Sequence, residues 1–106
     1  MDIAGRIYTI TESFPKEERF TLVSQMRRSA ISAPSNIAEG AGRKTKKEFV
    51  NFLHIAQGSL SELDSQWELS LRLKYIDNTT WNILDNMLNE EDKIITGLIC
   101  SQKEAN

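Results

Sequence analysis

The 106-residue sequence predicts an all-α protein, a single domain over residues 1–106 that folds as an antiparallel, up-down four-helix bundle. Three observations support this fold class. Apolar residues recur at spacings of three and four along four stretches, no stretch alternates apolar and polar residues as a strand does, and the connections between the stretches are short. Helices that each carry one apolar stripe bury it by packing against one another.

The first predicted helix, about residues 2–13, is short. Pro15 ends it, because the residue before a proline is disfavoured in the helical region. Its apolar residues are Ile3, Ile7, Tyr8 and Ile10.

The second predicted helix, about residues 21–40, contains Pro34. An internal proline costs a helix about 3 kcal/mol and leaves the carbonyl four residues earlier without its partner. We therefore expect a kink at Pro34, with a break over residues 32–35 as the alternative. The many small residues of this helix predict that another backbone approaches it closely; they are Ser29, Ala30, Ser32, Ala33, Ser35 and Ala38.

The ends of the second and third helices carry recognisable signals. Thr21 is the expected cap of the second helix, and Gly40 and Gly42 are its expected stops. Thr45 is the expected cap of the third helix, because Glu48 follows three residues later in the pattern of a capping box.

The third predicted helix, about residues 45–74, is the longest, and its apolar arc is wider than one neighbouring helix needs. The predicted core stripe consists of Phe49, Leu53, Ala56, Leu60, Leu63 and Trp67. A second set, displaced around the helix, consists of Phe52, Ile55, Leu69, Leu73 and Ile76. Large exposed apolar patches usually mark interfaces, so the second set predicts a homo-oligomer.

The fourth predicted helix covers about residues 79–100 and precedes a polar tail, residues 101–106. Asn78, Thr79 or Thr80 is its expected cap. Trp67 and Trp81 are expected to anchor the core rather than to stack on a ligand. The helix carries the apolar residues Trp81, Leu84, Met87, Leu88, Ile94, Ile95, Leu98 and Ile99.

Charge is strongly segregated along the chain. Between residues 25 and 47, six basic side chains and one acidic side chain give a formal charge of +5, which leaves −7 elsewhere and a total of −2. Such segregation bears on partners rather than on fold. The basic residues are Arg27, Arg28, Arg43, Lys44, Lys46 and Lys47.

These six side chains are the candidate nucleic-acid-binding residues. Arginine can hold a phosphate bidentately and lysine offers a mobile point charge, and such binding is sequence-tolerant and weakens with salt. In the alternative interpretation, Arg27 and Arg28 form ion pairs with acidic residues of the bundle or of a neighbouring subunit. The acidic candidates are Glu39, Glu62, Asp64 and Glu68.

Asn36 and Glu39 are polar residues three positions apart on the small-residue helix. We expect them to form a structural hydrogen-bonded network that fixes the helix register near Pro34. If Glu39 is buried, it needs a cationic partner, and Arg27 or Arg28 is the candidate.

Several classes of site and location are disfavoured. His54 is the single histidine and no Glu-x-x-His pair occurs, so we expect no metal, no cofactor and no catalytic residue, and hence no enzyme. No stretch resembles a membrane span or a signal peptide, and Cys100 has no disulfide partner in the chain. The chain is expected to be cytoplasmic.

The motifs QxRR over residues 25–28, NIAEG over 36–40 and GSxxEL over 58–63 resemble those of a bacterial family. Its members are the ribosomal protein-like four-helix-bundle proteins encoded in intervening sequences of 23S rRNA genes, and they are similar to the accessory variability determinant proteins of retroelements. The resemblance implies a homopentamer that binds RNA or DNA and a protein partner. It also implies an aromatic-containing stretch before Ile3, so the first helix is expected to be incomplete.

Two functions therefore remain open from the sequence. In the first, the chain is an oligomeric accessory protein that binds RNA or DNA through its basic surface. In the second, it is a protein–protein interaction scaffold whose basic residues form subunit ion pairs. Salt-dependent binding of unrelated nucleic acids distinguishes the two.

Overall fold

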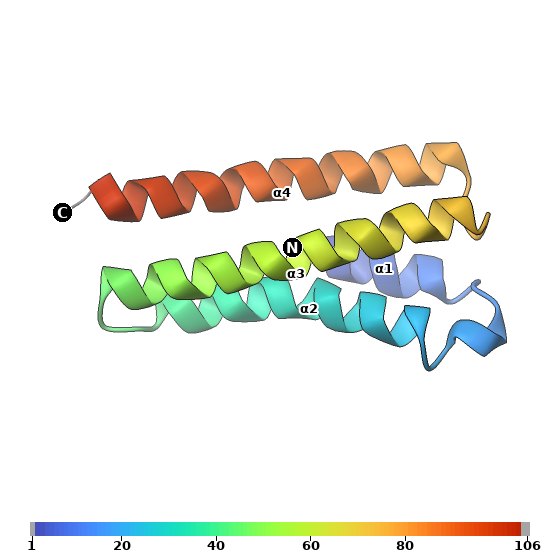
Figure 1. Ribbon diagram of the computed structural model, residues 1–106, viewed down its shortest axis with the longest axis horizontal. Coiled ribbons are helices and arrows are strands. Elements are labelled where there is room, and N and C mark those ends of the chain that lie inside the picture. The colour runs from blue at the N-terminus through green and yellow to red at the C-terminus, as the bar shows by residue number, and fades with distance from the viewer. Residues whose placement is uncertain (1, 105–106) are drawn as a thin grey trace.

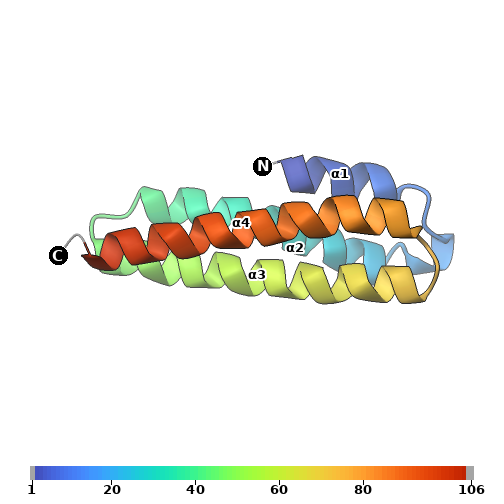
Figure 2. The ribbon, with the colours of Figure 1, turned by 90° about the horizontal axis from the view of Figure 1, so that it is seen from above.

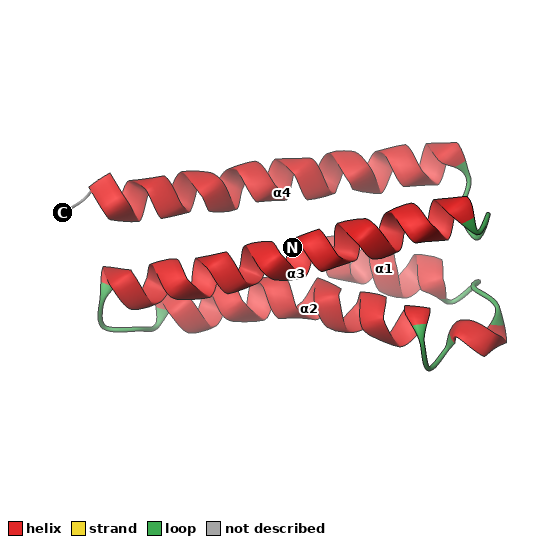
Figure 3. Cartoon of the chain, in the orientation of Figure 1, coloured by secondary structure: helices red, strands yellow, loops and turns green. Residues whose placement is uncertain are grey.

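The computed structural model describes residues 2–104 and contains four α-helices, with no strand in that part of the chain (Figures 1 and 3). The helices are α1 (Asp2–Thr11), α2 (Leu22–Ala41), α3 (Lys46–Arg72) and α4 (Asn78–Glu104), and a short 3₁₀ turn, η1 (Lys16–Glu18), precedes α2. The predicted all-α, four-helix class is confirmed. α4 continues beyond its predicted end at residue 100; the last two residues of the predicted tail, like Met1, lie outside the described residues.

The helices lie side by side along one axis, and the chain reverses direction at each connection (Figure 1). The molecule measures 48 × 24 × 18 Å. α1 is much shorter than the other helices and covers only one half of the bundle, so the half nearest the α2–α3 connection is formed by α2, α3 and α4 (Figure 2). The end of α4 and the α2–α3 connection lie at the same end of the molecule (Figures 1 and 2).

Most residues of the predicted apolar stripes form the core, but Tyr8 of α1 and Ile94 of α4 are exposed. On α3 every member of the predicted stripe is buried except Phe49, which is half-buried. The spacing of three and four therefore identified the buried face correctly, because one side of a helix returns after each turn. The buried apolar residues of the other helices include Ile3, Ile7, Leu22, Met26, Ala30, Ala33, Leu84, Leu88, Ile95 and Ile99.

The second apolar set of α3 is left largely uncovered. Ile55 is 51% exposed, and Leu69 and Leu73 are also exposed, although Phe52 and Ile76 are half-buried. Ile83 and Ile94 of α4 are exposed as well. The single chain thus presents apolar area that its own helices do not bury.

Helix α2 passes through Pro34 without interruption, so the alternative of a break over residues 32–35 is wrong. A proline lacks only its own N–H and obstructs one preceding carbonyl, and the packed neighbours of this helix hold the remaining turns together. A kink at Pro34 stays a prediction.

Gly40 is not a stop, because α2 continues to Ala41 and is capped at Gly42. A Cβ atom at Gly40 would lie 2.6 Å from the Cβ of Phe52 and 2.9 Å from Cδ1 of Phe49. Glycine is therefore required here for the close approach of α2 to α3 rather than for a turn. Gly40 was not among the six small residues from which a close approach of another backbone was predicted, so for those residues the approach stays a prediction.

The predicted caps meet different outcomes. Thr45 caps α3, since its hydroxyl oxygen accepts a 3.1 Å hydrogen bond from the backbone N–H of Glu48. Thr21 precedes α2 but makes no such bond, because its hydroxyl donates instead to the Glu18 carboxylate at 2.6 Å. At the start of α4 the Asp77 carboxylate accepts a hydrogen bond from the backbone N–H of Thr80. The cap is therefore Asp77, one residue before the three that were expected to cap this helix.

Side chains join two connections at the end of the bundle opposite the α2–α3 connection. The Tyr75 hydroxyl donates a 2.8 Å hydrogen bond to Glu18, and the rings of Tyr75 and Phe14 lie 5.2 Å apart. The hydrogen bonds from Thr21 and then Tyr75 lower the pKa of Glu18, because they stabilise its charged form. The α1–α2 and α3–α4 connections are thereby fastened to each other.

Candidate nucleic-acid interface

Four of the six candidate cations lie together at the α2–α3 connection: Arg43, Lys44, Lys46 and Lys47, here called the basic corner. Gly42 ends α2 and Thr45 caps α3, so the chain turns sharply between two helix ends and carries all four side chains on one short segment. All four residues are exposed. The first turn of α3 adds the positive end of a helix dipole to the same place.

Arg43 is held in position by two contacts. Its guanidinium forms a 2.6 Å ion pair with Glu39, one turn earlier, and lies 4.9 Å from the centre of the Phe52 ring. The sequence favoured Arg27 or Arg28 as the partner of Glu39; this is wrong, because Glu39 is exposed near the end of α2, where Arg43 follows four residues later. The other edge of the guanidinium can still meet a phosphate.

Arg27 instead fastens α2 to α1. Its Nε donates to the Thr11 hydroxyl at 3.0 Å, one of its terminal nitrogens donates to the Tyr8 carbonyl at 3.2 Å, and its guanidinium lies 4.6 Å from the Tyr8 ring centre. Its ion pair is with Glu12, at 3.4 Å, and not with any of the four acids named from the sequence. Sequence could not identify these partners, since they come from another helix.

Arg27→Ala is expected to lower the free energy of unfolding by about 1–3 kcal/mol, because hydrogen bonds from a charged donor and a cation–π contact are lost. Urea denaturation followed by circular dichroism measures the change. The matched control is Glu12→Ala, which removes only an exposed carboxylate and should change stability by less than about 0.5 kcal/mol. Equal losses in the two variants would contradict the assignment.

Arg28 belongs neither to the basic corner nor to the contacts that Arg27 makes with α1. It is exposed on α2, about 20 Å along the helix from the α2–α3 connection, and it makes no ion pair with the described residues. The six candidate cations therefore divide into the basic corner, a structural Arg27 and a separate Arg28.

Asn36 belongs to a polar network between α2 and α3. Its side-chain nitrogen donates to the Ser32 carbonyl at 2.8 Å and to the Ser32 hydroxyl at 3.1 Å, and that hydroxyl lies 2.8 Å from the hydroxyl of Ser59. Ser59 is buried, so the network lies against the core. Glu39, expected in the same network, pairs with Arg43 instead.

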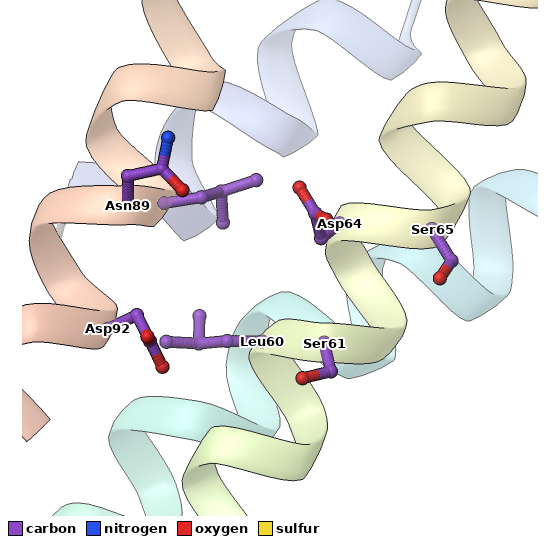
Figure 4. A pocket seen from close by; sticks show the side chains of 7 residues that line it. Leu60, Ser61, Asp64, Ser65, Asn89 and Asp92 are labelled. Carbon is purple, nitrogen blue, oxygen red and sulfur yellow. The ribbon is translucent and has the colours of Figure 1, made fainter. Parts of the chain in front are cut away.

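The groove between α3 and α4 is acidic, in contrast to the basic corner. The buried Leu60 and Leu88 are among its lining residues. Asp64 of α3 and Asp92 of α4 lie on its two sides (Figure 4). Burial raises the pKa of Asp64, and the nearby carboxylates of Asp85 and Glu68 raise it further. No single signal in the sequence indicated this groove, because its acids come from two helices and are interleaved with the core positions.

Other classes of site find no support in residues 2–104. These residues contain no group of three histidine, cysteine or acidic side chains placed to hold a metal ion. None of their helices combines the length and apolar character that crossing a membrane requires.

Comparison with known proteins identifies relatives by sequence and by structure. The model of the family described as 23S rRNA-intervening sequence protein matches residues 1–97. A crystal structure of a protein of unknown function from the S23 ribosomal protein family of Bacteroides thetaiotaomicron VPI-5482 is similar, with a TM-score of 0.85, 27% sequence identity and 92% of each chain covered. No curated protein matches the chain.

Proposed function

Because the chain belongs to the family of 23S rRNA-intervening sequence proteins, we propose that it is a non-enzymatic accessory protein of the bacterial cytoplasm that binds RNA or DNA without sequence preference. The basic corner is the binding surface. Its charges neutralise backbone phosphates and release counterions, a form of recognition that does not depend on the bases.

The observation that carries this proposal is the exposure of four cations on one short segment. Glu39 and Glu48 are the acidic residues nearest to them in the sequence, and Glu39 is engaged by Arg43. A surface that gathers positive charge in this way, on a protein whose total charge is −2, attracts polyanions and increases their rate of association.

The proposal includes assembly into a homopentamer. The exposed Ile55 and Leu69 of α3, with Leu73 directly after this helix, supply apolar area that a second copy can bury. A closed ring would repeat the basic corner on every subunit, so one polyanion could contact several corners at once and bind more tightly than to one. Light scattering, without and then with RNA, measures the number of subunits and tests the ring.

The binding surface is tested by replacing Arg43, Lys44, Lys46 and Lys47 with Ala. Loss of about four phosphate contacts should reduce the slope of log affinity against log salt by about 3 and weaken binding strongly at low salt. Fluorescence anisotropy with unrelated RNA and DNA oligonucleotides, at several salt concentrations, measures both quantities.

The matched control replaces four other exposed basic residues, Arg6, Lys16, Arg19 and Lys93, with Ala and changes the net charge equally. If this control loses as much affinity as the corner variant, the proposed surface is wrong. Absence of binding by the unmodified protein at low salt would overturn the function itself.

A second function, a protein–protein interaction scaffold, is favoured by one observation. The acidic groove between α3 and α4 and the exposed apolar side chains of α3 are surfaces that nucleic acid would not use. On this alternative the basic residues contact neighbouring subunits, so the four-residue corner variant would dissociate the oligomer in light scattering.

A further inference from the structure

A hollow of about 480 Å³ lies at the end of the bundle where α3 begins and α4 ends. Its residues come from both helices and from the cap between α2 and α3. They are Thr45, Lys46, Lys47, Val50, Asn51, Gln102 and Lys103. Figures 1 and 2 both place the last turn of α4 at the same end of the bundle as the α2–α3 connection, and Lys46 and Lys47 of the basic corner line the hollow.

The charge of this hollow distinguishes it from others on the surface. Three lysines line it, and none of the described residues that line it is acidic. A hollow of equal volume between α3 and α4 is lined instead by Asp64, Glu68 and Asp85, with Arg72 as its basic residue. An anionic group is therefore attracted to the end of the bundle and repelled from its side.

Lys103 extends the basic surface beyond the segment that the sequence indicated. It lies in the last turn of α4, more than fifty residues from the basic corner along the chain, but across the hollow from the first turn of α3. An anion in the hollow would therefore be attracted by lysines of α3 and by Lys103 of α4. Attraction from two sides would fix its position between the two helices.

The remaining lining suits a planar, polar group next to the anion. Val50 offers apolar surface, whereas the amides of Asn51 and Gln102 offer hydrogen-bond donors and acceptors. An amide can pair with the edge of any base, and it satisfies donors and acceptors alike. The combination of a phosphate site, an apolar contact and adaptable amides matches a nucleotide unit.

We infer that this hollow receives one unpaired nucleotide, its phosphate between Lys47 and Lys103 and its base against Val50, Asn51 and Gln102, so that the protein prefers single-stranded nucleic acid. The inference rests on the proposed function. A base inside a duplex is stacked and paired and cannot enter a hollow without being extruded, which costs free energy, whereas a base of a single strand is available.

The first test compares a single strand of about 12 nucleotides, as RNA and as DNA, with a duplex that carries the same number of phosphates. The single strand should bind about fivefold more tightly, because the added base contacts are hydrogen bonds of ordinary strength. Equal affinity for the two forms would overturn the inference while leaving the proposed function in place. No binding of either form would end both.

The second test separates the hollow from general charge. Lys103→Ala should reduce the salt slope by about 1 and weaken single-strand binding, whereas Lys93→Ala, an exposed lysine of the same helix, should not. Asn51→Ala combined with Gln102→Ala should remove the preference for single strands at unchanged charge. The control for this pair is Asn82→Ala with Asn86→Ala, which are exposed amides of α4.

Thermal unfolding of each variant tests whether the fold is kept, which is expected because all the substituted residues except the half-buried Gln102 are exposed. If the amide pair retains the preference for single strands, or if Lys93→Ala matches Lys103→Ala, the hollow does not receive the nucleotide.

Discussion

Trp67→Ala should lower the free energy of unfolding by about 3–5 kcal/mol, a large part of the stability of a domain of this size. Trp67 is fully buried in α3, and its indole nitrogen donates a 3.0 Å hydrogen bond to the carbonyl of Trp81 on α4. The truncation removes the largest buried side chain of the core and opens a cavity between the two helices. Urea denaturation at equilibrium measures the loss.

Trp81→Ala is the matched control, because the same side chain is removed from a half-buried position. This substitution should lower the free energy of unfolding by clearly less, because the half-buried Trp81 side chain buries less apolar area when the protein folds. Similar losses at the two positions would show that Trp67 is not the anchor of the α3–α4 contact.

Gly40→Ala should destabilise the protein by about 1–3 kcal/mol, although alanine is the better helix former. The new Cβ would lie 2.6 Å from the Cβ of Phe52, an atom fixed to the backbone of α3, so no side-chain rotation relieves the overlap. To relieve the overlap, α2 and α3 must move apart at the place where they are closest. A lower midpoint of thermal unfolding is the expected result.

Gly58→Ala provides a matched control with the opposite sign. Gly58 is exposed within α3, and a Cβ there meets nothing within 4 Å. Alanine should therefore stabilise the helix by about 0.5–1 kcal/mol through its lower backbone entropy in the unfolded chain. If both substitutions stabilise, the contact between Gly40 and Phe52 does not limit the packing.

Local signals predicted the helical class and the buried stripe of α3, because hydrophobic spacing and the Thr45–Glu48 capping pattern act within one or two turns of a helix. Gly40 shows where local reasoning ends. A glycine near the end of a helix can be required either for a turn or for the close approach of a neighbouring helix. The sequence does not distinguish the two, and in the structure the position of Phe52 shows that the close approach applies. Pro34 is similar, since the surrounding packing determines whether the helix continues.

The candidate interface was predicted as far as one segment of the chain could reveal it. Arg43, Lys44, Lys46 and Lys47 are neighbours in sequence and remain neighbours in the structure. Arg27 was grouped with them by composition, but its partners, Tyr8 and Thr11, belong to another helix. Lys103 lines a hollow together with Lys46 and Lys47, but the sequence did not group it with them, because a lone lysine near the end of the chain gives no sign of what lies beside it.

The two ends of the bundle are held together by different contacts. At one end contacts among Phe14, Glu18 and Tyr75 join two connections, and the Asp77 carboxylate caps the first turn of α4. Along the other half of the bundle α4 is held by packing, because Ile95 and Ile99 are buried and Gln57 of α3 donates hydrogen bonds to Thr96 and Asp92. Lys103, one turn beyond the buried Ile99, is therefore positioned by the packing of α4 and not by a covalent link to α3.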